Sequence, residues 1–467
     1  MPKPLKISSS QATFNIPDDL IQHTIAPYLD YPSLANFAIT NKTYGKLLLP
    51  ELEHRLPRLA IKLTTGADHT FLFSDGKLYA CGNNRLGQLG LGDHQNRLTF
   101  TQVTDLPGKV QQVVAGDYHS LVLTDAGLYA CGDNTYGQLG LGDRNERQTF
   151  TRVTGLSGKI EQMAACTHHT LILTDTGLYA CGHNKHGQLG LGNTKNRQTF
   201  TRVKGLPGKI LQMVAGDYHS LVLTDVGLYV CGENLSGQLG LGDHDKRNRF
   251  TRVTGLPGKV QQMAAGDEHS LVLTDAGLYA CGDNSRGQLG LGDTLSRQTF
   301  TRVTKLSGTV QQIIAGVPYT LALTDTGLYT CGGNATGQLG LGESCRGLPL
   351  WPYFVQVSGF QGTVQQVMTS GCHTLVLTDT GLYGCGNNRL GQLGLGATYA
   401  DMEVYSFTPV TPMNGKGKEQ WQHFHSCQKL ISNYKHGIFS KPHASLDQAD
   451  ANEEPSALAS IFNCNLL

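Results

Sequence analysis

The sequence predicts an all-β chain folded as a seven-bladed β-propeller, and two periodic features support this. The hexapeptide GQLGLG begins at seven positions: Gly87, Gly137, Gly187, Gly237, Gly287, Gly337 and Gly391. A Cys-Gly pair precedes each copy, and its cysteines recur every 50 residues from Cys81 to Cys331, then after 54 residues at Cys385. A feature that recurs in every unit at a fixed period indicates a structural role in the fold of that unit.

Each period carries four short strand signals separated by turn signals. In the second unit these are residues 109–116, 119–125, 127–132 and 149–154, with Gly-Asp, Asp-Ala-Gly and Asp-Asn followed by GQLGLGD between them. Four strands per unit, repeated seven times over residues 59–410, fit a closed propeller better than an open solenoid. Ring closure also removes exposed sheet edges. A degenerate half-unit at 428–440 either joins a blade or packs outside the ring.

Composition excludes several classes of protein. The 37 basic and 36 acidic side chains leave no global charge footprint for nucleic acid. No apolar run reaches the length of a transmembrane helix, and residues 1–15 lack the apolar core of a signal peptide. Seven of the twelve cysteines are one repeated position, so we interpret them as small buried side chains in a reducing compartment. No spacing of cysteine and histidine predicts a metal site, and no cofactor is expected.

The polar motifs of the repeat look catalytic, but their repetition argues otherwise. Asp117, His119 and Ser120 would suit a triad, yet this histidine recurs in six units, which indicates a residue that ties the turn together. GQLGLG lacks the Lys-Ser/Thr of a phosphate loop and opens no helix, so its glycines should supply positive backbone angles. A periodic arginine set, at positions 97, 147, 197, 247 and 297, is expected to be solvated or to bridge blades.

The repeat pattern G-x-x-H-S-L-x-L-T-x-x-G-L-Y-x-C-G-x-N-x-x-G-Q-L-G-L-G resembles the regulator of chromosome condensation repeat, although a Cys stands where that family often has Trp. The resemblance implies a seven-bladed propeller and, from the family's nucleotide-exchange member, a face that engages the small GTPase Ran. The matching positions are Asp117, His119, His169, Asp217, His219, Asp267, His269 and His373. Ala67, Thr167 and Val317-Pro318-Tyr319 depart from this pattern, and units two to five have equal lengths, so no obvious counterpart of that member's β-wedge is present.

The sixth unit breaks the period with a longer segment, residues 343–354. Its Arg346, Trp351, Tyr353 and Phe354 form a candidate contact loop, because exposed aromatic side chains in an extended loop suggest a partner. The alternative is that these aromatic side chains pack against the head or the tail of the chain.

The head of the chain, residues 14–58, is expected to be a small helical domain, preceded by a disordered segment at 1–13. Pro17-Asp18-Asp19 is a helix-start signal, and apolar residues follow at helical spacing. The segment resembles an F-box, which docks on a Skp-type adaptor of a cullin-RING ubiquitin ligase. The candidate adaptor-binding residues are Pro17, Leu20, Ile21, Ile25, Leu29 and Leu34. The alternative is a helical cap on the first blade.

The tail, residues 442–467, is expected to be flexible, after a half-repeat or packing segment at 411–441. The chain ends Cys464-Asn465-Leu466-Leu467, which fits a C-a-a-X prenylation box, and the terminal Leu favours geranylgeranyl transfer to Cys464. The tail holds four acids and no Lys or Arg, so a polybasic second anchor is missing from it.

These features predict a monomeric, non-enzymatic recognition protein that resembles effectors injected by intracellular bacteria into a host cell. The expected location is host cytoplasm and a membrane, after modification by a host prenyltransferase. The first hypothesis is that the propeller engages and activates a Ran-type GTPase, with the F-box linking it to the ligase. The alternative is an F-box substrate receptor whose propeller holds an unknown client without exchange activity. A lone structural scaffold is the third interpretation.

Overall fold

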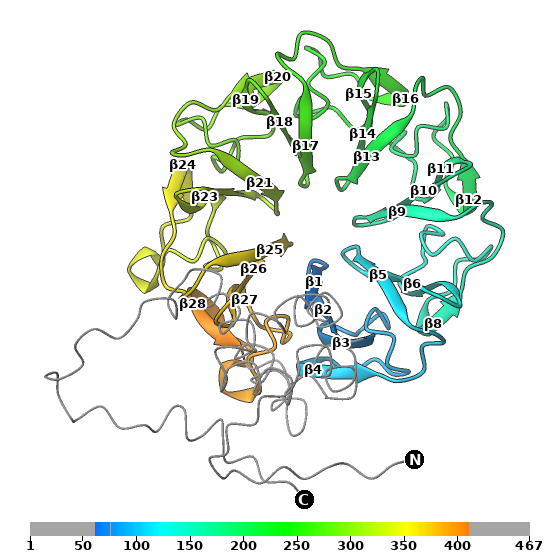
Figure 1. Ribbon diagram of the computed structural model, residues 1–467, viewed down its shortest axis with the longest axis horizontal. Helices are drawn as coiled ribbons and strands as arrows, with labels where there is room; N and C mark the ends of the chain where they lie inside the picture. Colours follow the sequence, from blue (N-terminus) through cyan, green and yellow to red (C-terminus); the bar gives the residue numbers. More distant parts are fainter. Residues whose placement is uncertain (1–60, 75, 411–467) are drawn as a thin grey trace, which may run out of the picture.

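The computed structural model describes residues 61–74 and 76–410. They form seven four-stranded antiparallel sheets arranged as a ring (Figure 1). This confirms the all-β, seven-bladed propeller. The residues of the expected F-box and Cys464 lie outside the described residues, as does the predicted half-unit at 428–440. Within the described part, the two helical segments are single-turn 3-10 helices, and neither has the length to cross a bilayer.

The strands of each blade are contiguous in sequence and follow one another outward from the axis, so that β1 is innermost and β4 outermost in the first blade. Blade 1 comprises β1 (Lys62–Thr65), β2 (His69–Ser74), β3 (Lys77–Gly82) and β4 (Arg97–Val103). Blade 2 comprises β5 (Val110–Ala115), β6 (His119–Thr124), β7 (Gly127–Gly132) and β8 (Arg147–Arg152). Blade 3 comprises β9 (Ile160–Ala165), β10 (His169–Thr174), β11 (Gly177–Gly182) and β12 (Arg197–Arg202). Blade 4 comprises β13 (Ile210–Ala215), β14 (His219–Thr224), β15 (Gly227–Gly232) and β16 (Arg247–Arg252).

The remaining blades repeat this order, with the two 3-10 helices placed before the outermost strands of blades 6 and 7. Blade 5 comprises β17 (Val260–Ala265), β18 (His269–Thr274), β19 (Gly277–Gly282) and β20 (Arg297–Arg302). Blade 6 comprises β21 (Val310–Ala315), β22 (Tyr319–Thr324), β23 (Gly327–Gly333), η4 (Glu343–Cys345) and β24 (Leu350–Gln356). Blade 7 comprises β25 (Val364–Ser370), β26 (His373–Thr378), β27 (Leu382–Asn387), η5 (Ala397–Tyr399) and β28 (Glu403–Val410).

The GQLGLG segment joins each blade to the next one. In the second unit Gly140 has φ 69°, and a Cβ built there would lie 2.3 Å from the Phe200 ring of blade 3. Leu141 forms a β-bridge with Thr199, and Gly142 N–H donates to the Gln198 carbonyl at 2.9 Å. The predicted positive backbone angles are therefore confirmed, and a side chain at Gly140 would displace the neighbouring blade.

The hydrophobic core lies between blades. One cluster joins Leu121, Leu139 and Val153 of blade 2 to Met163 and Ile172 of blade 3. The repeated cysteine is fully buried there, and Cys131 Sγ lies 3.4 Å from the Gln88 carbonyl of blade 1. Burial raises the pKa of this thiol well above its usual range, so it is a protonated packing residue, as the sequence predicts.

Blade 7 meets blade 1 through contacts that recur at other junctions between neighbouring blades. Leu63 N–H donates to Gln366 Oε1 at 3.1 Å, and the Gln366 amide donates back to the Leu63 carbonyl at 3.0 Å. Thr70 donates to the Gln392 carbonyl at 2.7 Å. Within the described residues, the ring therefore closes by packing of complete blades, and β1 to β4 need no strand from elsewhere in the chain.

Strand order divides the connections between two faces. The turns between first and second strands, and the loops between third and fourth strands, share one face, which we name the His-turn face. The turns between second and third strands, and the connections from one blade to the next, share the other face. We name it the Lys-turn face, after Lys109, Lys159, Lys209 and Lys259 in those connections.

Candidate partner-binding face

The repeated histidines form a closed belt that links neighbouring blades beneath the His-turn face. The Nε2 atom of His119 lies 2.9 Å from Thr170 Oγ1 of blade 3, and this hydroxyl donates to the Gln138 carbonyl at 2.8 Å. Because the hydroxyl proton is committed to that carbonyl, Nε2–H must be the donor to the hydroxyl. The same contact recurs in the other five units with histidine, and the last joins His373 to Thr70 across the closing blades at 3.2 Å.

All six belt histidines are fully buried and neutral. Burial lowers the pKa of His69, His119, His169 and His219 to about 3. It lowers the pKa of His269 and His373 to about 4. Among residues 61–74 and 76–410, their Nδ1 atoms have no hydrogen-bond partner, which suits unprotonated nitrogens. The prediction of a structural histidine agrees with this geometry, but the ring joins its blade to the next one rather than closing its own turn, and these residues lie beneath the His-turn face rather than on it.

Tyr319 takes the belt position in the sixth unit. It is fully buried, and its hydroxyl donates to the His373 carbonyl at 2.6 Å and lies 3.0 Å from Thr374 Oγ1. The belt thus continues through blade 6 with a longer side chain that reaches past the turn.

The predicted carboxylates converge on the axial end of the His-turn face. Asp117 and Asp217 are each 8% exposed, while Asp68 and Asp267 are half-buried. Thr167 donates to Asp117 Oδ2 at 2.8 Å, and the Cys166 thiol donates to Asp217 Oδ1 at 3.0 Å. The structure therefore brings together Asp117, Asp217 and Asp267, and it adds Asp68. We name these four residues the axial carboxylates.

Burial and mutual repulsion make the charged form of the axial carboxylates unfavourable in the folded chain. Burial, only partly offset by the Thr167 hydrogen bond, raises the pKa of Asp117 to about 6. Burial and the neighbouring Asp217 raise the pKa of Asp267 far above its usual range, so this carboxyl shares a proton with Asp217. Ligand atoms of Asp117, Cys166 and Asp217 lie within 4.8 Å of one another, but Thr167 and the thiol already donate to two of the oxygens.

A cluster of aromatic and histidine rings lies beside the axial carboxylates over blades 2 to 4. Tyr118 stacks on His168 with centroids 5.8 Å apart, and Tyr136 contacts His168 and His183 at 4.9 and 4.6 Å. His186 packs against Tyr218 at 5.2 Å and pairs with Glu233. We name Tyr118, Tyr136, His168, His183, His186 and Tyr218 the aromatic cluster.

Sequence reasoning missed the aromatic cluster, although the signal was present. Position 118 is Tyr, and its equivalents in the next four units are His168, Tyr218, Glu268 and Pro318. Most of the cluster's side chains are half-buried, in contrast to the fully buried histidine one residue later in each turn. Variation at a solvent-facing position of an otherwise repeated turn is the feature that could have identified it.

The candidate contact loop of blade 6 divides into packed and exposed parts. Trp351 and Phe354 lie in β24 and pack into the core between blades, and Phe354 is only 7% exposed. Tyr353 is 46% exposed and contacts Trp351 edge-on at 6.3 Å. Arg346 lies over the Tyr405 ring, 4.9 Å from its centroid. The aromatic residues are thus strand residues, and within this set Tyr353 and Arg346 remain accessible.

The periodic arginines form an outer rim, and in four of the blades they make partly exposed ion pairs within their own blade. Arg147 lies 2.6 Å from Asp143 four residues earlier, and equivalent pairs form at Arg97, Arg247 and Arg297. These pairs match the solvated alternative, because both partners belong to the same loop.

A model of the regulator of chromosome condensation (RCC1) repeat matches residues 75–123, 125–173, 175–223, 227–273 and 275–323. A second model of this repeat matches residues 60–88, 110–138 and 260–288. The chain belongs to the RCC1 repeat family. No curated protein matches its sequence.

Solved structures with this propeller include human WBSCR16, which is 23% identical at a TM-score of 0.64 and covers 73% of this chain and 94% of its own. A crystal structure of Kap60 bound to yeast RCC1 (Prp20) matches at 22% identity and a TM-score of 0.64, covering 77% and 85%. Prp20p from Saccharomyces cerevisiae, described with its binding properties to Gsp1p and histones, matches at 23% and 0.57, covering 68% and 82%. At these identities the likeness shows the shared fold of the RCC1 repeat proteins.

Proposed function

We propose that this RCC1-repeat propeller is a non-enzymatic recognition protein that engages a Ran-type small GTPase through its His-turn face and promotes the active state of that GTPase. The observation that carries the proposal is the break in symmetry on this face. Axial carboxylates and an aromatic cluster occupy varying positions on a ring whose other turn residues repeat. Tyrosine is enriched at the centre of protein interfaces, and acidic groups favour a basic partner surface.

The family relationship supports the choice of partner. The RCC1-repeat resemblance implies that acidic residues on this face engage Ran, and the similar Prp20p is described with its binding to Gsp1p. The belt histidines contribute only by holding the turns in place, since all six are fully buried. The proposed contact residues are therefore Asp117, Asp217, Asp267, Tyr118, Tyr136 and Tyr218.

The test measures release of a labelled nucleotide from purified Ran-type GTPase, together with capture of the GTPase on immobilised propeller protein. The variant Asp117→Asn/Asp217→Asn/Asp267→Asn should weaken capture at least tenfold. Glu161→Gln is the matched control, because Glu161 is an exposed carboxylate on the Lys-turn face. Absence of both capture and accelerated release with the unmodified protein would end this proposal.

The wider role adds three features of the chain that lie outside the described residues. We propose that the protein is a bacterial effector in the host cell, that its F-box recruits a cullin-RING ligase through a Skp-type adaptor, and that Cys464 carries a prenyl anchor. Pro17→Ala/Leu20→Ala should abolish co-purification of the adaptor, and Cys464→Ser should abolish prenyl incorporation by host cytosol. If adaptor binding persists in the double variant, residues 14–58 are a cap and not an F-box.

A further inference from the structure

The Lys-turn face carries an uneven distribution of charge. Exposed cations follow the connections of blades 2 to 5: Arg152, Lys159, Arg202, Lys204, Lys209, Arg252, Lys259, Arg302 and Lys305. Five exposed carboxylates share these blades on this face: Asp125, Glu161, Asp175, Asp225 and Asp275. None of the nine cations pairs with a carboxylate among the residues that the structure describes.

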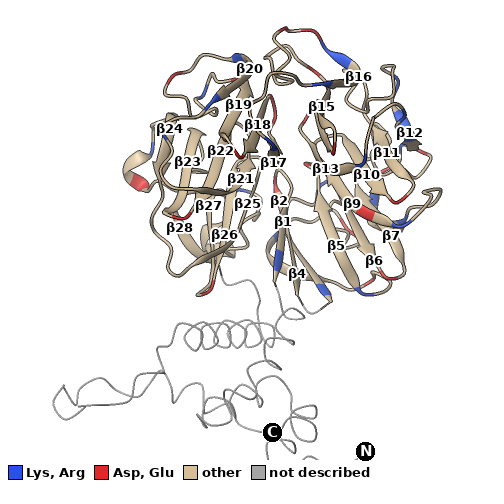
Figure 2. Cartoon of the chain, turned by 45° about the horizontal axis from the view of Figure 1, so that its top comes forward, with Lys and Arg blue, Asp and Glu red and all other residues tan. Residues whose placement is uncertain are grey.

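Blades 6 and 7 lack this charge. Thr309 and Thr363 replace the turn lysine, and Gln356 replaces the strand arginine. Between residues 306 and 410 the only Lys or Arg residues are Arg346 and Arg389, so Figure 2 shows few blue segments on β21 to β28. The nine cations of blades 2 to 5 therefore form a one-sided basic crescent.

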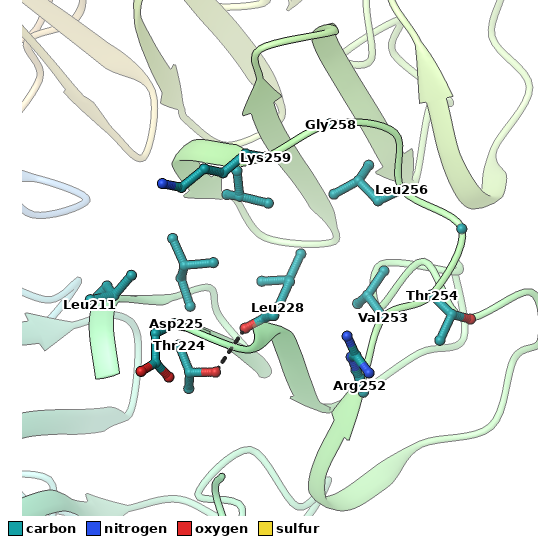
Figure 3. A pocket seen from close by; sticks show the side chains of 14 residues that line it. Leu211, Thr224, Asp225, Leu228, Arg252, Val253, Thr254, Leu256, Gly258 and Lys259 are labelled. Carbon is teal, nitrogen blue, oxygen red and sulfur yellow. Dashed lines mark hydrogen bonds between the residues drawn. The ribbon is translucent and has the colours of Figure 1, made fainter. Parts of the chain in front are cut away.

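A groove lined by apolar residues together with Asp225, Arg252 and Lys259 opens within the basic crescent, between blades 4 and 5 (Figure 3). Its volume is about 510 Å³, and Leu211, Leu228, Val253 and Leu256 line it, with Lys259 and Arg252 among its polar residues. Leu211 is 41% exposed.

Two exposed apolar residues distinguish blade 4 on this face: Leu211 lines the groove, and Val226 lies in the turn between the lining residues Asp225 and Gly227. Where blade 4 has Leu211, the neighbouring units have Glu161 and Gln261. Where it has Val226, which is 46% exposed, they have Thr176 and Ala276. Arg252 donates to the Val226 backbone carbonyl at 3.1 Å, so this cation lies beside the turn that carries the exposed Val226 side chain.

The chain enters and leaves the ring on the same face. β1 begins at Lys62, and the outermost strand of blade 7, β28, ends at Val410, both at the edge where blade-to-blade connections run. Blades 7 and 1 lie across the ring from the groove (Figure 1). The 57 residues after Val410 end in the Cys464 box, so a lipid there would be tethered to the Lys-turn face.

We propose that the basic crescent docks on a bilayer surface that contains anionic phospholipids, with Leu211 and Val226 entering the headgroup region. Each Lys or Arg near such a surface strengthens binding about fivefold. A single lipid chain gives only marginal anchoring, and the acidic tail provides no cation, so the crescent supplies the second signal. The docked protein presents its His-turn face to the cytosol, where a GTPase partner can reach it.

The bilayer is favoured over nucleic acid because of the exposed apolar pair. A phosphate backbone is bound by cations and other hydrogen-bond donors and offers no apolar surface, whereas an exposed Leu and Val within a basic surface gain free energy where they can enter an apolar phase. The inference extends the proposed membrane location, but it requires neither the lipid on Cys464 nor a GTPase.

The experiment uses the unlipidated full chain, Cys464→Ser, in co-sedimentation with vesicles. Vesicles of phosphatidylcholine alone are compared with vesicles containing about 30% phosphatidylserine, a composition that sets a strongly negative surface potential. Binding should require phosphatidylserine and should fall steeply as NaCl is raised. Lys209→Gln/Arg252→Gln/Lys259→Gln should weaken the partition coefficient on the order of 100-fold. Leu211→Gln/Val226→Ala, which restores residues of neighbouring blades, should weaken it about tenfold.

The matched control is Leu235→Ser, which removes a 73% exposed leucine from the His-turn face and should leave vesicle binding unchanged. Equal binding to both vesicle types, or binding that the triple variant leaves intact, overturns the proposal. Binding that persists in Leu211→Gln/Val226→Ala and is fully displaced by duplex DNA assigns the crescent to nucleic acid instead. GTPase capture by the triple variant separates the two proposals, since that variant should capture the GTPase like the unmodified protein.

Discussion

The belt histidines and the axial carboxylates lie in the same family of turns, one or two residues apart, yet they differ in repetition, hydrogen bonding and charge. The histidines repeat in six units, are fully buried and each have a hydroxyl partner on the next blade. The carboxylates occur in four units, reach the axial opening and repel one another. One turn position is thus used for assembly, and the nearby carboxylate position is the one for which we propose a role in recognition.

The two sets also respond oppositely to protons. A belt histidine is kept neutral because burial lowers its pKa, so protonation favours the unfolded chain. Asp117 and Asp267 have raised pKa values, so protonation relieves a cost in the folded chain. The comparison can therefore be tested by pH and by substitution.

The largest expected effect is acid unfolding through the belt. The histidine pKa values are about 6.5 unfolded and 3 to 4 folded, so their stabilisation is complete above pH 6.5 and is lost as pH falls toward 4. Each histidine should lower the unfolding free energy at pH 5, relative to pH 7, by on the order of 2 kcal/mol. Urea unfolding at pH 7 and pH 5 measures this.

The axial carboxylates should offset part of that acid loss, because their protonation stabilises the fold over the same range. Asp117→Asn/Asp217→Asn/Asp267→Asn should therefore make the decline between pH 7 and pH 5 steeper. A flat pH profile in both proteins would show that the belt histidines are not kept neutral by folding.

The next effect concerns a single belt residue. His169→Ala removes a buried ring and deprives the Ser220 hydroxyl of its donor at 3.0 Å, so unfolding free energy should fall by about 3 kcal/mol. Tyr118→Ala, one residue before the equivalent histidine in blade 2, should cost less than about 1 kcal/mol but weaken GTPase capture. The opposite result, a small stability loss in His169→Ala and a large one in Tyr118→Ala, would contradict the structural role of the belt histidine.

The parts of the structure that the sequence could predict are those that repeat. Strand positions, the buried cysteines and the positive backbone angle at Gly140 follow from one 50-residue pattern. The burial of His119 was not predicted together with its role, because a turn residue gives no sign of which side of the turn its ring will occupy. The aromatic cluster and the Leu211 groove depend on contacts between units, and periodicity says nothing about residues that differ between units.

A smaller effect is expected from Asp117. Its carboxyl has a pKa of about 6 because it is buried, so its charge at pH 8 destabilises the fold. Asp117→Asn should raise the unfolding free energy by on the order of 2 kcal/mol at pH 8, and the gain should decline as pH falls below 6 and vanish only below about pH 4. Glu161→Gln is the exposed control and should change neither value. Destabilisation by Asp117→Asn at pH 8 would show that the charge itself is needed for folding.

The smallest effect is expected at the outer rim, whose repeated ion pairs should contribute little to the unfolding free energy. Four units pair the rim arginine with an aspartate, while in blade 3 Arg197 meets Asn193 at 3.2 Å. Asn193→Asp completes the pattern, but both partners of the existing pairs are partly exposed, so it should add no more than about 0.5 kcal/mol. Unfolding at low and high NaCl measures the gain, which salt should remove. A gain above about 1.5 kcal/mol would contradict this expectation. It would mean that the rim ion pairs, like the belt histidines, contribute substantially to the stability of the ring.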